Sequence, residues 1–399
     1  MITTITPYTD PRNRALPGEG FDGVVRVVVG AHYGTGTLLF GGHAILTAAH
    51  LFTDNATSAE VHFETAQGAQ TITSSQVTTH GGHDADGNND LAIIWLSESA
   101  PLLAERYSLY RDSNEIDQTI TMVGYGKQGT GATGKVDSTT ALRSKASNQV
   151  DGLIGTLKEF QGNNMSWNPT SDSQLIADFD DGTSPHDALG LLMDKPGLGL
   201  GQSEGLIAPG DSGGPAFING QIAGVASYTT HLTSDGTTPD IDNISNSSFG
   251  EVAAWQRVSY YQQWIDESLR AALPSAPAQA ANVVKAVAEG NSGTSYAYFL
   301  VKFNNTRPND TETFSVSYAT RNGTATAGSD YIAAGGTLNI YPDESQVVIP
   351  VEIIGDTTPE PNETFYMDIT NPTGGGFGHG IVTLTAVRTI LNDDGPILS

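Results

Sequence analysis

The sequence predicts an all-β protein with more than one domain. Its 399 residues include 46 glycines and many runs of Thr, Val and Ile, and few stretches have the spacing of a long helix. This composition indicates short strands separated by turns. A chain of this length exceeds one ordinary domain, so we expect two or three. No apolar run reaches the roughly 18 residues of a membrane-spanning helix, so we expect no insertion into a membrane.

The most informative segment is a glycine-rich turn around a serine, with the sequence Gly210-Asp211-Ser212-Gly213-Gly214-Pro215. Glycine lacks a Cβ, so the chain can bend sharply here and expose backbone N–H groups beside the hydroxyl. Such N–H groups can bind a developing oxyanion. A serine alone is a weak nucleophile, so this interpretation requires a base and a group that orients the base.

Both groups occur upstream of the turn. His50 follows the apolar run 44–46 and three small residues, so it lies at the end of an expected strand. Asp90 directly precedes the apolar run 91–96, which indicates a buried strand. The chain order histidine, aspartate, serine differs from that of α/β-hydrolases and subtilisins and fits the chymotrypsin type. We therefore predict a catalytic triad of His50, Asp90 and Ser212.

From about residue 21 to about residue 272, the chain resembles the trypsin-like serine proteases of the chymotrypsin fold. Segments 34–39, 124–126 and 224–228 resemble the family's strand before the histidine, its Gly-aromatic-Gly stretch and its strand after the nucleophile. A stripe of helical spacing follows at Val258, Tyr261, Trp264, Ile265 and Leu269. The resemblance implies a chymotrypsin-like double β-barrel that ends in a helix.

The resemblance also implies a serine endopeptidase that acts on protein or peptide substrates through an acyl-enzyme. Ser212 would attack the scissile carbonyl, His50 would accept its proton, and Asp90 would fix the imidazole tautomer. The N–H groups of Gly210 and Ser212 would form the oxyanion hole. Catalysis of this kind requires no cofactor.

Four residues are expected to bind the substrate: Leu206, Ser227, Tyr228 and Thr229. By resemblance, Leu206 lies at the base of the primary pocket, and the strand at 227–229 lines the groove. Leucine cannot pair with a Lys or Arg side chain, so we expect a preference for small or medium apolar side chains.

Two other functions remain open on the same residues. One is a catalytically inert, calcium-dependent adhesion or binding protein built on a protease fold. The other is an esterase that uses the same triad.

A second domain is expected after a Pro/Ala-rich linker at 273–281, because proline stiffens a linker and blocks helix continuation. Beyond it, Phe314, Val316 and Tyr318 alternate with serines and share one face of an expected strand. Val347, Ile349, Val351 and Ile353 share one face of another. Period-two alternation indicates a small antiparallel sandwich.

This second domain resembles a Calx-beta domain over nearly all of residues 282–395, through fragments such as 323–331, 360–365 and 390–394. The expected domain division follows. It comprises an N-terminal extension at 1–20, a protease domain at 21–272, the linker and a Calx-beta domain at 282–399.

The Calx-beta resemblance implies a calcium site at one end of the sandwich. Calcium takes six to eight oxygen ligands in flexible geometry. The residues that could supply them are Glu289, Asp330, Asp356, Glu360, Asp393 and Asp394. The alternative is a set of acidic loop residues that binds no ion.

Another acidic run, Asp178-Phe179-Asp180-Asp181-Gly182 with Asp187, lies before the nucleophile. This stretch resembles bacterial trypsin-like proteases that also carry a Calx-beta module. A cation site and a solvated loop are both open, and the solvated loop is favoured.

Asp211 requires a partner, because a buried carboxylate without one is costly. One hypothesis is cleavage after Gly20 or nearby, which would free a new N-terminus at about Phe21. The other is that His32 pairs with Asp211 in the uncleaved chain.

The net charge of −26 disfavours binding to nucleic acid or to anionic lipid. Cysteine is absent, so the fold must be stabilised by its core rather than by disulfides, and bound ions could add to that stability. Residues 1–7 have neither the basic region nor the apolar core of a Sec signal peptide. We expect a secreted or cell-surface bacterial protein without a Sec signal. The sequence does not predict its oligomeric state.

Overall fold

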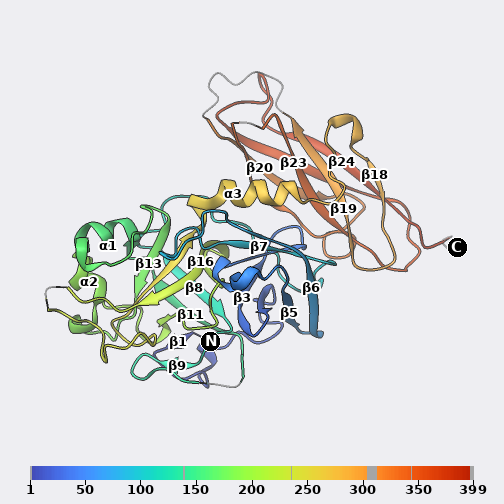
Figure 1. Ribbon diagram of the computed structural model, residues 1–399. Coiled ribbons are helices and arrows are strands. Elements are labelled where there is room, and N and C mark those ends of the chain that lie inside the picture. Colours follow the sequence, from blue (N-terminus) through green and yellow to red (C-terminus); the bar gives the residue numbers. More distant parts are fainter. Residues whose placement is uncertain (1, 138–139, 235, 303–311, 343, 396–399) are drawn as a thin grey trace. The chain divides into compact units, whose positions relative to one another are not determined.

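The chain forms two compact units in the computed structural model, Met1–Ile265 and Asp266–Ser399 (Figure 1). The structure describes residues 2–137, 140–234, 236–302, 312–342 and 344–395. The division lies a few residues before the expected linker at 273–281, so the domain boundaries suggested by the sequence stay predictions. Within the described residues, no helix has the length and apolar character needed to cross a membrane.

The first unit begins with a closed barrel of six strands in the order β2-β3-β4-β7-β6-β5. These strands are β2 (Val24–Val29), β3 (His32–Leu38), β4 (Ala44–Thr47), β5 (Glu60–Thr65), β6 (Gly68–Thr79) and β7 (Ala92–Leu96). Val25, Val27 and Val29 point into the barrel, where they pack in one core with Phe63 and Ile94. The period-two pattern of the sequence therefore sets which face of each strand is buried.

The rest of the first unit is built on a seven-stranded antiparallel sheet in the order β11-β8-β15-β16-β17-β13-β12. Its strands are β8 (Thr119–Gly124), β11 (Ser144–Gln149), β12 (Gly152–Leu153), β13 (Gln174–Asp178), β15 (Pro215–Ile218), β16 (Gln221–Thr230) and β17 (Val252–Arg257). Its core includes Leu175, Phe179 and Trp255. Two packed β cores in one unit confirm the predicted all-β class.

The N-terminal residues belong to this unit, and the expected extension at 1–20 stays a prediction. They take part in a four-stranded sheet of β1 (Thr3–Thr4), β9 (Gly129–Thr130), β10 (Gly134–Lys135) and β14 (Gly205–Leu206). Thr3 pairs with Leu206, and Ile2 is buried in the core of the seven-stranded sheet.

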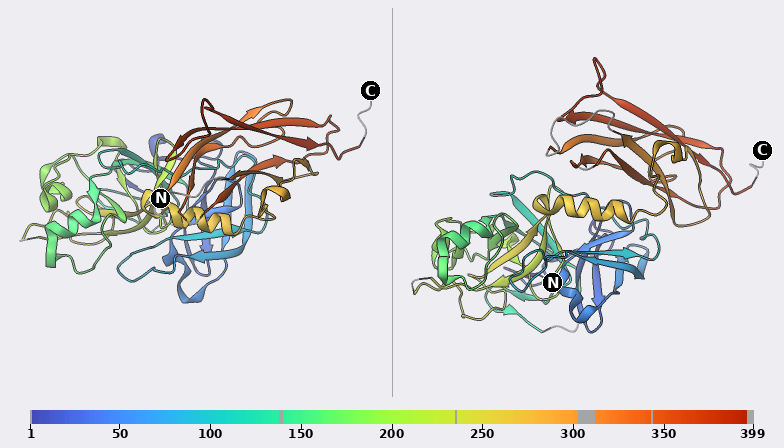
Figure 2. Two further views of the ribbon diagram at one scale, coloured as in Figure 1. Left: turned by 90° about the horizontal axis from the view of Figure 1, so that it is seen from above. Right: turned by 45° about the horizontal axis from the view of Figure 1, so that its top comes forward.

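Three α-helices complete the unit: α1 (Ile154–Gln161), α2 (Ala188–Met193) and α3 (Val258–Ala271), which continues into the second unit. Helices α1 and α2 lie side by side at one edge, as the views in Figures 1 and 2 agree. Val258, Tyr261 and Ile265 of α3 are buried. This confirms the predicted C-terminal helix.

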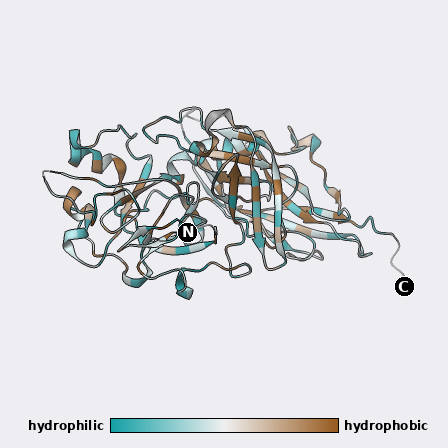
Figure 3. Cartoon of the chain, turned by 60° about the horizontal axis from the view of Figure 1, so that its bottom comes forward, coloured by the Kyte–Doolittle hydropathy of each residue, from teal (hydrophilic) through white to brown (hydrophobic). Residues whose placement is uncertain are grey.

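The second unit contains a five-stranded sheet, β18-β24-β23-β20-β21, and a two-stranded sheet, β19-β22. The strands are β18 (Ala286–Ala288), β19 (Thr294–Lys302), β20 (Phe314–Asn322), β21 (Gly335–Ile340), β22 (Gln346–Ile354), β23 (Glu363–Thr373) and β24 (Leu384–Leu391). Buried and more exposed residues alternate along parts of β20, β22 and β23, and Figure 3 shows bands of hydrophobic and hydrophilic residues along strands of the chain. All pairings are antiparallel except that of β18 with β24.

The core of the second unit centres on Phe365, which is fully buried. Its ring stacks on Tyr331 at 4.5 Å and meets Phe299 edge-on at 5.7 Å. Aromatic pairs of this kind add to the area that they bury.

We predict that Phe365→Ala lowers the free energy of unfolding of the second unit by about 3–5 kcal/mol, because it leaves a cavity between two aromatic rings. Urea unfolding followed by circular dichroism measures this loss. Tyr366→Ala on the same strand is the matched control and should cost much less, because Tyr366 is only half-buried. Equal losses for the two variants would contradict this description of the core.

Candidate active site

His50 and Asp90 meet because they follow and precede two paired strands. Thr47, the last residue of β4, lies opposite Ala92, the first residue of β7. The antiparallel register therefore brings the residue three positions after β4 close to the residue two positions before β7. His50 Nδ1 and Asp90 Oδ2 are 2.7 Å apart, and the His50 backbone N–H donates to Asp90 Oδ1 at 2.8 Å.

The Asp90 carboxyl group is buried, with 2% of its side chain exposed against 34% for His50. Ser227 Oγ, from β16, donates a third hydrogen bond to it at 2.5 Å. Burial acts to raise the pKa of Asp90, but the hydrogen bonds from His50 and Ser227 outweigh it and hold that pKa below its ordinary value. Asp90 is therefore an ionised acceptor for the imidazole.

The turn around Ser212 has the backbone conformation that its glycines permit. Gly210 has φ of +100° and Gly213 has φ of +82°, in the region that favours glycine. Gly213 N–H donates to Ala226 in β16 and Gly214 N–H donates to Asp211, so the turn is tied to the sheet. The backbone N–H groups of Gly210 and Ser212 have no acceptor among the described residues.

The same turn packs against the segment that leads to His50. A Cβ on Gly213 would lie 2.1 Å from Thr47 Oγ1 and 2.7 Å from the Ala48 nitrogen, so no larger residue fits. Thr35 N–H donates to the Ser212 carbonyl at 2.8 Å. Ser212 Oγ itself forms no hydrogen bond with the described residues, His50 included.

Asp211 is a buried carboxyl group beneath the turn. It accepts hydrogen bonds from Gly126 N–H at 2.7 Å and from Ala208 N–H at 2.9 Å. His32 is exposed at the start of β3, whereas Asp211 is buried, and His32 is not among the groups that shift the pKa of Asp211, so that hypothesis is wrong. Tyr33, which follows His32 in β3, lies beside Gly210, and its pKa is raised by burial and by the charge of Asp211.

The segment proposed for activation cleavage is held in place at Asp22. Its buried carboxylate accepts hydrogen bonds from Gly18 N–H at 2.9 Å and pairs with Arg143 at 2.6 Å. Cleavage after Gly20 stays a prediction.

A pocket of about 550 Å³ opens beside His50 and Asp90. It is lined by His50, His83–Gly87, Asp90, Trp167 and Ser227–Thr230. Trp167 Nε1 donates to the Tyr228 hydroxyl at 3.2 Å, and the two rings meet at 88°. Three of the four predicted substrate-binding residues, Ser227, Tyr228 and Thr229, therefore line one pocket.

The fourth predicted residue, Leu206, lies elsewhere. It is fully buried in β14, packs in the core of the seven-stranded sheet, and does not line this pocket. Its assignment to the base of a primary pocket stays a prediction. Sequence reasoning missed Trp167, because a lone aromatic between the predicted strands carries no signal of its own.

Five of the six predicted calcium ligands of the second unit fall into two groups. Glu289, Asp393 and Asp394 place carboxylate oxygens within 4.8 Å of one another, and so do Asp330, Glu360 and Glu363. Burial raises the pKa of Glu289 to about 7, with further contributions from the charges of Asp356 and Glu360. Asp356 therefore adds negative charge but belongs to neither group. Glu363 was missed, although it lies in the 360–365 fragment that carries the family resemblance.

The acidic run of the first unit is not the solvated loop that the sequence favoured. Asp178, Asp180 and Asp187 are buried, with their carboxylate oxygens within 4.8 Å of one another. Burial and the charges of neighbouring carboxylates raise the pKa values of Asp178 and Asp180. Only Asp181, which pairs with His186 at 2.6 Å, behaves as the partly exposed residue that was expected.

Two family models match the chain. The trypsin model matches residues 16–163, and the Calx-beta domain model matches residues 290–394.

Curated relatives match short stretches of the chain. Sodium/calcium exchanger 2 of Rattus norvegicus is 39% identical over 95 residues, which is 21% of this chain and 10% of that protein. The sodium/calcium exchanger Calx of Drosophila melanogaster is 36% identical over 89 residues, 22% of this chain and 9% of that protein. The adhesion G-protein coupled receptor V1 of Danio rerio is 40% identical over 73 residues, 18% and 1% of the two chains. The chain thus spans a tenth or less of the length of these relatives.

Among solved structures, neuropsin, a serine protease expressed in the limbic system of mouse brain, aligns with a TM-score of 0.46 and 16% identity. The alignment covers 64% of this chain and 98% of neuropsin. On the two family matches, the chain carries a domain of the trypsin family followed by a Calx-beta domain.

Proposed function

We propose that the chain is a serine endopeptidase whose nucleophile is Ser212. The observation that carries the proposal is the 2.7 Å contact between His50 Nδ1 and the buried carboxylate of Asp90. An imidazole whose Nδ1–H is held by a carboxylate presents Nε2 as a base. The trypsin-family match supports a hydrolase of this type.

The reaction has two halves. Ser212 Oγ attacks the scissile carbonyl carbon while His50 Nε2 takes the hydroxyl proton. The imidazolium then gives that proton to the leaving amine as the C–N bond breaks, which leaves an acyl-enzyme. Water attacks the ester in the same way, and Ser212 regains its proton from His50. In unliganded enzymes the serine–histidine hydrogen bond is often long and shortens only when substrate binds.

The turn supplies the electrostatic part of the chemistry. The N–H groups of Gly210 and Ser212 have no acceptor among the described residues, so they can donate to the oxyanion of the tetrahedral intermediate. Removing one such donor typically costs about 3–4 kcal/mol of transition-state stabilisation. The positive φ of Gly210 supports this role, because it fixes the direction of the turn.

The pocket beside the triad supports an extended peptide as substrate. Trp167 and Tyr228 form an aromatic part of its lining. Ser227, which also lines the pocket, is hydrogen-bonded to Asp90, so the pocket lies next to the triad. A side chain of the substrate that enters this pocket would bury apolar surface next to the base. Apolar side chains fit the aromatic part of the lining, whereas Asp84 and Asp86, which also line the pocket, disfavour anionic ones.

We further propose that the Calx-beta domain binds Ca²⁺ through the two sets of acidic residues described above, one around Glu289 and one around Glu363. Hard oxygen donors suit this ion, and Asp394 has a buried Oδ2 atom without a hydrogen-bond partner among the described residues. The ion would neutralise the charge that gathers at Glu289 and Glu363 and would take no part in peptide hydrolysis.

Substitutions in the triad should abolish turnover without unfolding the protein. We expect Ser212→Ala and His50→Ala each to lower kcat by about 10⁶-fold. Asp90→Asn should lower kcat by about 10⁴-fold, because the amide favours the wrong imidazole tautomer. The measurement is hydrolysis of a peptide library and of casein, with circular dichroism as the test of folding.

His83 provides the matched control, because it lies 3.9 Å from Asp90 Oδ1 yet has no step in the proposed reaction. His83→Ala should retain kcat within about tenfold of the unmodified chain, since it removes no acid, base or nucleophile. Full peptidase activity in Ser212→Ala would overturn the proposal. Hydrolysis of small esters without any cleavage of casein would assign the triad to an esterase.

Replacing Glu363 should weaken calcium binding by the second unit. We expect Glu363→Gln to raise the Kd of one Ca²⁺ site by about tenfold or more, because affinity follows the number of charged ligands. Calorimetric titration of the full chain measures this. The control is Asp368→Asn on the same strand, whose carboxylate pairs with Arg321 at 2.8 Å. An unchanged titration of Glu363→Gln would contradict the assignment.

A further inference from the structure

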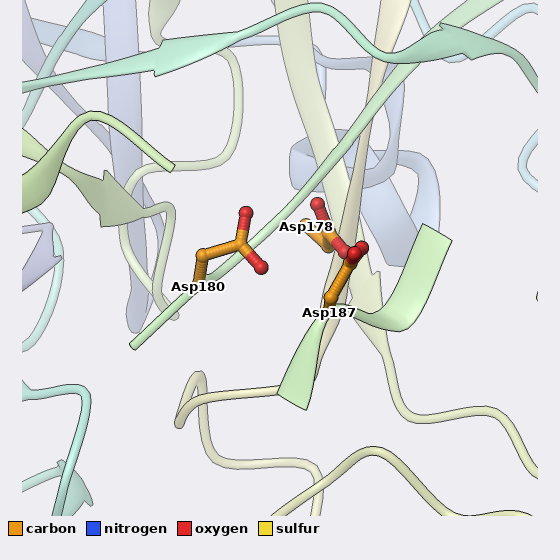
Figure 4. Close-up of side chains that lie close together, drawn as sticks. All are labelled: Asp178, Asp180 and Asp187. Carbon is orange, nitrogen blue, oxygen red and sulfur yellow. The ribbon is translucent and has the colours of Figure 1, made fainter. Parts of the chain in front are cut away.

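A buried acidic site lies in the first unit, apart from the catalytic residues. Asp178 ends β13, Asp180 follows two residues later, and Asp187 precedes α2. Their exposed fractions are 3%, 6% and 6%. Figure 4 shows the carboxyl groups of Asp178 and Asp187 facing one another and that of Asp180 directed toward them.

Backbone donors hold two of the three carboxylates in place. Leu189 N–H donates to Asp178 Oδ2 at 2.6 Å. Asp187 accepts from Gly190 N–H at 2.7 Å and from Gly197 N–H at 3.1 Å. Both side chains are therefore oriented by main-chain groups before any ligand arrives.

Asp180 differs from the other two. Neither of its carboxylate oxygens accepts a hydrogen bond from a described residue, and Oδ1 is shielded from water. Its backbone N–H donates to Glu204 Oε1 at 2.8 Å, which brings another carboxylate close to the group. Asp180 is thus a buried, unpartnered polar side chain that points into a cluster of its own charge.

No described cation neutralises this cluster. Glu204 and Asp151, which accepts from the Asp178 backbone N–H at 3.4 Å, bring the number of clustered acids to five. In the described part of the chain, none of these five forms an ion pair with a lysine, arginine or histidine. Burying an ionised carboxylate without a partner of opposite charge is costly. A positively charged ligand would remove that cost.

The spacing of the oxygens suits a single ion. Three oxygens within 4.8 Å of one another lie close enough to converge on one ion, and small adjustments of the side chains would give the calcium–oxygen distances of about 2.3–2.6 Å. Magnesium instead keeps several waters and seldom uses an all-protein cage. We propose that Asp178, Asp180 and Asp187 bind one Ca²⁺ ion in the first unit.

The bound ion would join segments that no disulfide connects, since the chain has no cysteine. It would link the end of β13 to the start of α2 and, through the Asp180–Glu204 contact, to the residues that enter β14. The chain reaches the nucleophile turn four residues after β14. The site therefore stabilises the half of the unit that carries Ser212.

The test uses the full chain and the variant Asp180→Asn, with equilibrium dialysis against radiolabelled Ca²⁺. The unmodified chain should bind one more tightly held ion than Asp180→Asn, because every carboxylate of the second unit is intact in both. Asp181→Asn, which changes the adjacent residue outside the group, should bind as many ions as the unmodified chain.

Thermal unfolding gives a second readout that does not depend on counting ions. With chelator, Asp180→Asn should unfold at the same temperature as the unmodified chain or a higher one, because it removes an acid whose ionised form is disfavoured by burial and by the neighbouring carboxylates. Addition of Ca²⁺ should raise the unfolding temperature of Asp180→Asn by less than it raises that of the unmodified chain. If Asp180→Asn does not fold, Asp187→Asn replaces it, since an asparagine can still cap α2. Equal ion counts and equal calcium-induced shifts would overturn the proposal, whatever the peptidase activity.

Discussion

The candidate site depends on the buried carboxyl group of Asp90. Its hydrogen-bond donors come from both halves of the first unit: the backbone and ring of His50 after the barrel strand β4, and the hydroxyl of Ser227 in the seven-stranded sheet. A carboxylate stays ionised when buried only where several donors stabilise it. The group that orients the imidazole is therefore also a polar contact between barrel and sheet, and catalytic geometry and packing share one cause.

The nucleophile turn is fixed by a different constraint, which is the lack of space. Gly213 lies against Thr47 and Ala48, and a Cβ at Gly126 would lie 2.3 Å from Asp211 Oδ2. Only glycine fits these positions, so the turn approaches the barrel and the carboxylate beneath it closely. The motif thus combines two requirements: positive φ for the bend and missing side chains for the approach.

Much of the site could be predicted because its residues border apolar runs. His50 and Asp90 each flank a buried strand, and strand register then brings them together. The burial of Asp180 could not be predicted, since an acidic run reads as solvated until its tertiary neighbours are known. The pairing of Thr3 with Leu206 could not be predicted either, because two-residue strands are too short to show periodicity. Local patterns therefore predicted elements, and long-range contacts decided which side chains share an environment.

The central claim is that Ser212 is a hydroxyl activated by His50 under the control of Asp90. The most direct measurement is reaction of the full chain with a fluorophosphonate probe, followed by mass spectrometry of the labelled peptide. We predict one label, on Ser212, that is lost in the variant His50→Ala. A chain that is folded yet unlabelled, or a His50→Ala variant that is labelled equally well, would contradict this claim.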